Sequence, residues 1–208
     1  MSIVGIQYRN PFLYNLLIPI IHKRKLMREL RVAVGKNQSV FEVAAGFGRL
    51  KKYIDQSNKY SGIDLNEKFI KYAQERNIAV SFGDIFDPTQ YKNTDVTLVV
   101  DVIHHLPSAR RAEMFDLIFK HTQCKVIVLE PAFLNFESRH GRLFRPLDKI
   151  IMKMDSDGVN KINGFLTREE YVKLFEALLG SRYGKNFDLT VKIVKSYYIV
   201  VYEKRLTI

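Results

Sequence analysis

The sequence predicts an α/β protein in which an open, mostly parallel sheet carries helices on both faces and ends in an antiparallel strand pair. Between Ser39 and Leu129, short β-rich apolar runs alternate with helical patterns, an order typical of parallel strands joined by crossover helices. Near the C-terminus, two β-rich runs at 189–195 and 197–203 follow each other directly. Such close spacing favours an antiparallel pair at one edge of the sheet. We therefore expect one sheet of seven strands.

Each expected element has a local signal. The parallel strands are expected at 39–43, 60–65, 78–82, 96–102 and 125–129, and the helices of this region at 50–54, 67–76 and 108–121. The run at 96–102 is almost continuously apolar, as in a strand buried on both faces. Asn66 stands where an N-cap is needed for the helix at 67–76, because its short side chain can accept a backbone hydrogen bond there.

Length and composition fit a single globular domain over residues 1–208. Hydrophobic residues make up 47% of the chain and charged residues 26%, which excludes a compositionally disordered protein. The single cysteine, Cys124, excludes an intramolecular disulfide framework and is expected to be inert. No Cys/His group has the spacing of a zinc site, so we expect no metal and a reducing, cytoplasmic location.

The apolar stretch Pro11–Ile21 does not fit a membrane-spanning helix. It is about half as long as the roughly 20 residues that a bilayer requires, and it contains Asn15 and Pro19. A basic cluster follows it rather than precedes it, which is the reverse of the order in a signal peptide. We expect this stretch to be part of the core, a partner surface or an interfacial patch.

The net charge of +11 is unevenly distributed. Residues 1–36 carry +6 and residues 132–208 carry +5, whereas residues 37–131 are neutral. Net charge bears on partners and solubility rather than on fold. We therefore expect the two flanks and the middle of the chain to meet different partners.

Polar residues and glycines gather where the expected strands end. Open α/β sheets bind ligands at the carboxyl ends of their strands. The residues concerned are Glu42, Ala44, Gly46 and Gly48 after the first strand, Asp64 after the second, Asp84 and Ile85 after the third, and Asp101 to His105 after the fourth. Small residues let a backbone approach a ligand closely, and a carboxylate can accept hydrogen bonds from both hydroxyls of a ribose.

These strand ends resemble those of the class I S-adenosylmethionine-dependent methyltransferases, in particular the small-molecule type 11/12 group. The acidic-x-Gly-x-Gly-x-Gly loop of that family corresponds to Glu42-x-Ala44-x-Gly46-x-Gly48, and the run Asp101–Leu106 (DVIHHL) resembles the motif after strand four. The resemblance covers about residues 37–131 and 187–204. It implies a Rossmann-like fold and S-adenosylmethionine as cofactor.

The resemblance also implies roles for single residues. Asp64 would bind the ribose, Leu65 and Ile85 would pack on the two faces of the adenine, Asp84 would contact the adenine amine, and Asp101 would contact the methionine part. Ala44 departs from the family pattern, because it replaces the first glycine. An alanine is tolerable there if its φ angle is an ordinary negative one.

Other nucleotide-binding patterns fit less well. The dinucleotide pattern Gly-x-Gly-x-x-Gly/Ala, read from Gly46, places Lys51 at the sixth position, where a small residue is needed. A Gly-Lys-Ser/Thr motif is absent after the first strand. These departures disfavour a nicotinamide enzyme and exclude a P-loop protein.

The candidate catalytic residues are His104 and His105. Methyl transfer from a sulfonium is an in-line displacement that depends mainly on alignment, and a base is needed only if the acceptor must lose a proton. The alternative for each histidine is a packing or hydrogen-bonding role beside a strand end. Glu130, at the end of the fifth strand, is a candidate for a substrate contact.

The flanks are expected to recognise the methyl acceptor. Residues 1–36 would form a basic helical cap, and residues 132–165 an insertion over the acceptor site, with apolar and basic residues interleaved at 139–154. This pattern fits a helix lying on an anionic membrane, and equally an ordinary core helix with solvated charges. The leading hypothesis is a methyltransferase for a small or lipophilic acceptor, lipids included. The alternatives are an RNA methyltransferase that uses its basic flanks, and a non-catalytic cofactor-binding partner subunit.

Overall fold

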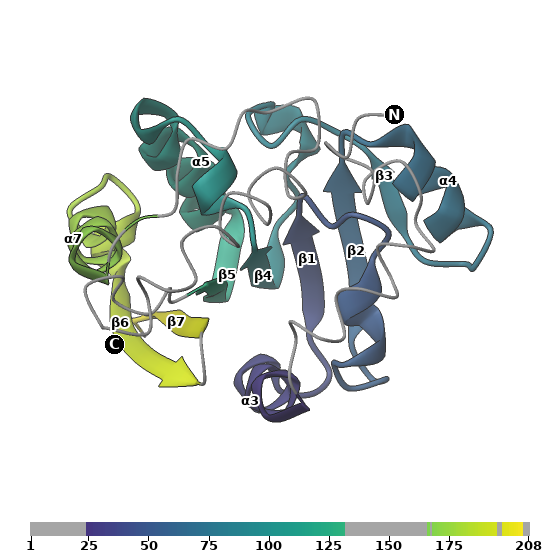
Figure 1. The fold of residues 1–208 in the computed structure, drawn as a ribbon, viewed down its shortest axis with the longest axis horizontal. Helices are drawn as coiled ribbons and strands as arrows, with labels where there is room; N and C mark the ends of the chain where they lie inside the picture. Colours follow the sequence, from purple (N-terminus) through teal and green to yellow (C-terminus); the bar gives the residue numbers. More distant parts are fainter. Residues whose placement is uncertain (1–23, 132–165, 167, 195–196, 206–208) are drawn as a thin grey trace, which may run out of the picture.

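The computed structural model describes residues 24–131, 166, 168–194 and 197–205. These residues form a seven-stranded sheet in the order β3-β2-β1-β4-β5-β7-β6 (Figure 1). The strands are β1 Ser39–Val43, β2 Lys59–Asp64, β3 Val80–Phe82, β4 Thr94–Val100, β5 Thr122–Pro131, β6 Phe187–Val194 and β7 Tyr197–Lys204. β1 to β5 are mutually parallel, and β7 pairs antiparallel with both β5 and β6. The predicted fold class is confirmed.

Helices cover both faces of this sheet, as predicted. They are α3 Arg24–Val34, α4 Glu67–Gln74, α5 Ser108–His121 and α7 Arg168–Leu179. One apolar core joins the sheet to α5 and α7, for example through Phe115 and Phe175. A second core joins the opposite face to α3 and α4, for example through Leu30 and Phe69. The alternation of side chains along the strands supplies both cores at once.

The N-terminus of α4 forms as its sequence predicts. The Asn66 side chain accepts hydrogen bonds from the backbone amides of Lys68, at 3.1 Å, and Phe69, at 3.4 Å. These bonds satisfy two of the amide groups that the first turn of a helix leaves without an intrahelical partner. The same cap places the residue before it, Leu65, at the junction between β2 and α4.

The helix predicted at 50–54 is wrong in type and length. The structure has a single 3₁₀ turn there, η1 Arg49–Lys52. Its N-terminus is set by Gly48, which has a left-handed φ of 71°. Downstream, the Asp55 side chain accepts the amide and the hydroxyl of Ser57, and β2 begins at Lys59. The hydrogen bonds between Asp55 and Ser57 form a separate turn, so the helical segment ends after one turn.

β4 ends earlier and β3 starts later than expected, each by two residues. β4 ends at Val100 rather than residue 102, because Asp101 turns the chain with a left-handed φ of 56°. β3 begins at Val80 rather than residue 78, after Asn77, which has a φ of 55°. Positive φ angles are incompatible with the extended backbone of a strand.

Parts of the predicted flanks lie outside the described residues. These parts are residues 1–23 of the N-terminal cap and the whole insertion at 132–165. The described part of the cap is mainly α3, which packs on the sheet through Leu26, Met27, Leu30 and Val34. Within the described ranges, no helix combines the length and the apolar character needed to cross a bilayer.

Candidate functional site

The candidate site lies at the carboxyl ends of β1, β2 and β4. β1 stands between β2 and β4, so the chain leaves β1 toward one edge of the sheet and later returns to build the other. In Figure 1 the arrowheads of β1 and β2 point to the same edge of the sheet. The point where the strand order reverses is where open α/β sheets form a ligand-binding crevice.

The loop after β1 has an unusual backbone that side chains would disturb. Gly46 and Gly48 have φ angles of 56° and 71°. A Cβ atom on Gly48 would lie 2.4 Å from the Cγ2 atom of Ile78, so a larger residue does not fit. The two glycines therefore keep the loop tight against its neighbours.

Ala44 has a φ of 51°, so the condition on which an alanine was expected to be tolerable is not met. In an L-residue this conformation brings Cβ close to the backbone and costs about 1–2 kcal/mol. The loop is held in place regardless, since the amide of Ala45 donates to the carbonyl of Ile63 on β2 at 2.8 Å. Ala44 thus takes the glycine-like backbone of the family pattern under strain.

Asp64 binds the glycine loop directly. Its Oδ2 atom accepts the amide of Gly46 and its Oδ1 atom accepts the amide of Asn66, both at 2.7 Å. A carboxylate offers about four acceptor positions. Asp64 therefore ties the glycine loop to the start of α4.

Glu42 is a buried carboxyl group beside this loop, with only 4% of its surface exposed. Its Oε2 atom accepts a short hydrogen bond from the hydroxyl of Tyr60, the one hydrogen bond of its side chain to another described residue. Burial raises the pKa of Glu42 to about 8; the Tyr60 hydroxyl opposes this shift, and the nearby charges of Asp64 and Asp101 add to it. The group is suited to a cationic ligand, whose charge would favour the ionised carboxylate.

The candidate adenine contacts follow β2 and β3: Leu65 comes directly after β2, and Asp84 and Ile85 lie in the loop after β3. Leu65 is 43% exposed, whereas Ile85 is buried. The exposed Asp84 accepts the amide of Phe86 at 2.9 Å. This bond caps the local turn and leaves the other carboxylate oxygen for further contacts.

The segment after β4 brings Asp101, His104 and His105 to the same edge. The amide of Asp101 donates to the carbonyl of Leu129 on β5 at 3.0 Å. The two histidines belong to a 3₁₀ turn, η3 Ile103–His105, and their ring centroids are 4.2 Å apart. His104 is buried, and its Nδ1 atom lies 2.8 Å from the Oε2 atom of Glu130; His105 is half-buried.

Glu130 was predicted only as a substrate contact, but it is completely buried and hydrogen-bonded within the protein. Its Oε1 atom accepts the amides of Val102 and Ile103 at 2.8 and 2.7 Å. The available signal was an acid directly after the apolar run at 126–129, since a carboxylate that becomes buried requires several donors.

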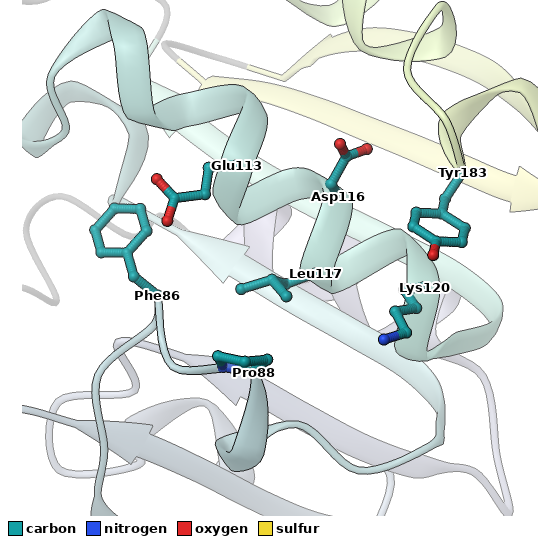
Figure 2. A pocket seen from close by; sticks show the side chains of 7 residues that line it. All are labelled: Phe86, Pro88, Glu113, Asp116, Leu117, Lys120 and Tyr183. Carbon is teal, nitrogen blue, oxygen red and sulfur yellow. The ribbon is translucent and has the colours of Figure 1, made fainter.

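Two further features are not among the predicted site residues. A groove over α5 is lined by Phe86, Pro88, Glu113, Asp116, Leu117, Lys120 and Tyr183, none of which is a predicted site residue (Figure 2). Cys124 is exposed on β5. Among the described residues, no group of histidine, cysteine and acidic side chains is arranged to hold a metal ion.

Residues 41–122, from β1 to the start of β5, match the family model of a methyltransferase domain. This region of the chain is thus similar in sequence to a methyltransferase domain. The matched region holds every candidate cofactor residue identified above. No curated protein matches this sequence significantly.

Solved structures share the fold of this chain at low sequence identity. The pyocyanin biosynthetic protein PhzM is 18% identical with a TM-score of 0.65, over 94% of this chain and 58% of that one. Human N-acetylserotonin methyltransferase, solved with S-adenosylmethionine, is 17% identical with a TM-score of 0.65, over 95% and 57%. A Thermotoga maritima S-adenosylmethionine-dependent methyltransferase, described as a possible histamine N-methyltransferase, is 15% identical with a TM-score of 0.63, over 95% and 98%.

The chain thus spans less than two thirds of the length of the first two of these proteins and nearly all of the third. The shared part contains the sheet and its strand ends.

Proposed function

We propose that this protein transfers the methyl group of S-adenosylmethionine to a small-molecule acceptor. The observation that carries the proposal is the convergence of Glu42, Asp64 and Asp101 around a tight glycine loop at the switch point of the sheet. Bound S-adenosylmethionine supplies a methyl group already activated on a cationic sulfur. The residues of the chain then need only to bind and align the two reactants.

The donor set fits this cofactor. We assign the backbone of the Ala44–Gly48 loop to the methionine part, with Glu42 and Asp101 nearby to balance its positive charges. We assign the carboxylate of Asp64 to the ribose hydroxyls, because a carboxylate can accept hydrogen bonds from both of them. The exposed Leu65 offers an apolar surface to the adenine ring, Ile85 packs from the other side, and Asp84 is assigned to the amine.

We assign His104 and His105 to the acceptor side of the site. A carboxylate only accepts hydrogen bonds, so the Nδ1 atom of His104 carries the hydrogen toward Glu130, and its Nε2 atom is the one that can accept a proton. His105 is the more exposed of the two rings. If the methyl acceptor is a hydroxyl or an amine that must lose a proton, these two histidines are the groups that remove it.

The acceptor class is supported by what related folds are described as acting on. These include N-acetylserotonin and, for a Synechocystis enzyme, magnesium protoporphyrin IX. A lipid-like acceptor, contact with an anionic membrane, and RNA remain predictions, because residues 1–23 and 139–154 lie outside the described part of the chain. Exposed Arg24, Lys25 and Arg28 on α3 belong to the same basic N-terminal region.

Two measurements, made one after the other, test the proposal. Calorimetry should show one S-adenosylmethionine bound per chain, and absence of binding would remove the assignment. Protein incubated with methyl-labelled S-adenosylmethionine should then transfer label to a fraction of cell lysate separated into small-molecule, lipid and RNA pools. Label in the RNA pool alone would favour the RNA alternative, and binding without transfer to any pool would favour a non-catalytic subunit.

A further inference from the structure

Glu130 is the centre of a buried hydrogen-bond cluster behind the histidine pair. Besides the amides of Val102 and Ile103 on Oε1, its Oε2 atom lies 2.8 Å from Nδ1 of His104 and accepts the hydroxyl of Tyr171 at 3.1 Å. These four donors occupy the four acceptor positions of one carboxylate. The cluster ties η3 to β5 and, through Tyr171, to α7.

Tyr171 contributes more to this cluster than the packing of its ring. The side chain is fully buried, and its ring lies 5.6 Å from that of Phe175 and 5.4 Å from that of Tyr198. A phenylalanine would make the same ring contacts. The hydroxyl makes its one hydrogen bond, within the described part of the chain, to Glu130, and a buried hydroxyl without such a partner would be destabilising.

The segment that Glu130 holds is also strained. Asp101 has a φ of 56° immediately before Val102, whose amide Glu130 accepts. Left-handed non-glycine residues persist only where the surrounding structure fixes them. The two amide bonds to Glu130 and the bond from Asp101 to the carbonyl of Leu129 supply that constraint.

We propose that Glu130 and Tyr171 are positioning residues that hold the Asp101–His104 segment in its working geometry, with the Tyr171 hydroxyl acting through Glu130. The link to catalysis depends on the proposed function, which assigns Asp101 and His104 to the reaction. The structural link between Tyr171 and the Asp101–His104 segment does not depend on the proposed function. α7 follows the chain segment 132–165, so this cluster connects the post-insertion helix with the reaction centre.

The substitution Tyr171→Phe tests this link without creating a cavity. Loss of this one hydrogen bond should accelerate hydrogen exchange at the Val102 and Ile103 amides about tenfold. Tyr202→Phe is the matched control, because the buried hydroxyl of Tyr202 donates to the carbonyl of Phe175 on the same helix at 3.0 Å. It should leave exchange at both amides unchanged.

A second variant reads the histidine itself. Glu130→Gln should abolish the preference of His104 for the Nδ1–H tautomer, as measured by nitrogen-15 spectra of the imidazole ring, whereas Tyr202→Phe should preserve it. Unchanged amide exchange in Tyr171→Phe, equal acceleration in Tyr202→Phe, or an unaltered tautomer in Glu130→Gln would overturn the proposal. Binding of S-adenosylmethionine to the unmodified protein is measured in parallel, so failure of the proposed function is recognised separately.

Discussion

The backbone amide of Gly46 donates a 2.7 Å hydrogen bond to the carboxylate of Asp64, so the loop after β1 and the end of β2 form one unit. The second oxygen of the same carboxylate accepts the amide of Asn66, the N-cap of α4. One side chain therefore aligns the glycine loop with the start of the next helix. The same carboxylate is the group proposed to bind the ribose.

Replacement of Asp64 by asparagine should weaken binding of S-adenosylmethionine at least tenfold. Hydrogen bonds to a charged acceptor contribute about 1.5–3 kcal/mol, and the amide keeps only one acceptor oxygen. Titration calorimetry measures the effect. The protein should stay folded, since the asparagine oxygen can still accept one of the two backbone amides.

Asp95→Asn is the matched control for this prediction. Asp95 accepts the amide and the hydroxyl of Ser39, each at 2.7 Å, at the opposite end of β1. It should lose comparable stability while cofactor affinity stays unchanged. Equal loss of affinity in both variants would mean that Asp64 acts through the fold and not through the ligand.

Ala44→Gly should stabilise the protein by about 1 kcal/mol. Glycine adopts the left-handed φ of 51° without steric cost, and this gain exceeds the added entropy of the unfolded chain. Denaturant unfolding measures the difference. Ala45→Gly is the neighbouring control: Ala45 is buried and is not among the described residues with positive φ, so the same change there should destabilise.

The sheet and the position of the site were predictable because they depend on local pattern. Alternation of apolar runs with helical segments identifies a parallel sheet, and polar residues at strand ends mark its ligand edge. Asn66 illustrates this: one residue type at one position predicts the start of α4, and the structure confirms it.

The conformation of Ala44 and the partners of Glu130 were not predictable in this way. The φ of Ala44 is imposed by the packing of the loop on β2, and no local signal accompanies an alanine in that state. Glu130 receives its donors from Val102, Ile103 and His104, 26 to 28 residues earlier, and from Tyr171, 41 residues later. Such a cluster depends on the tertiary fold, so a sequence pattern shows only that a buried acid needs donors.

Glu42 should make stability depend on pH. Its pKa in the folded protein is raised to about 8 from an ordinary value of 4.5, mainly by burial. The folded protein therefore retains a proton that the unfolded chain releases, and the free energy of unfolding should fall as pH rises from 5 to 8, on the order of a few kcal/mol. Denaturant unfolding at several pH values measures this slope.

Glu42→Gln isolates the contribution of this group. The glutamine oxygen can still accept the Tyr60 hydroxyl, but the residue has no charge to titrate. The difference in unfolding free energy between the two proteins should therefore change across pH 5 to 8, with the variant gaining relative to the unmodified chain as pH rises. A difference that is constant over this range would show that Glu42 is ionised in the folded protein.

Gly62→Ala, a substitution on β2, should displace the glycine loop that packs against this strand. A Cβ atom on Gly62 would lie 2.6 Å from the Cβ of Ala45 and 2.9 Å from the carbonyl oxygen of Glu42. The loop must move away from β2, at a cost of about 1–3 kcal/mol in stability. Because this movement also pulls Gly46 away from Asp64, affinity for S-adenosylmethionine should fall as well.

Gly35→Ala separates this steric effect from the general cost of replacing a glycine. Gly35 has a φ of 81°, but no atom lies within 4 Å of the position its Cβ would take. Its substitution should cost about 1 kcal/mol from backbone strain alone and leave cofactor affinity unchanged. If both variants bind S-adenosylmethionine as tightly as the unmodified protein, contact between the loop and β2 does not shape the cofactor site.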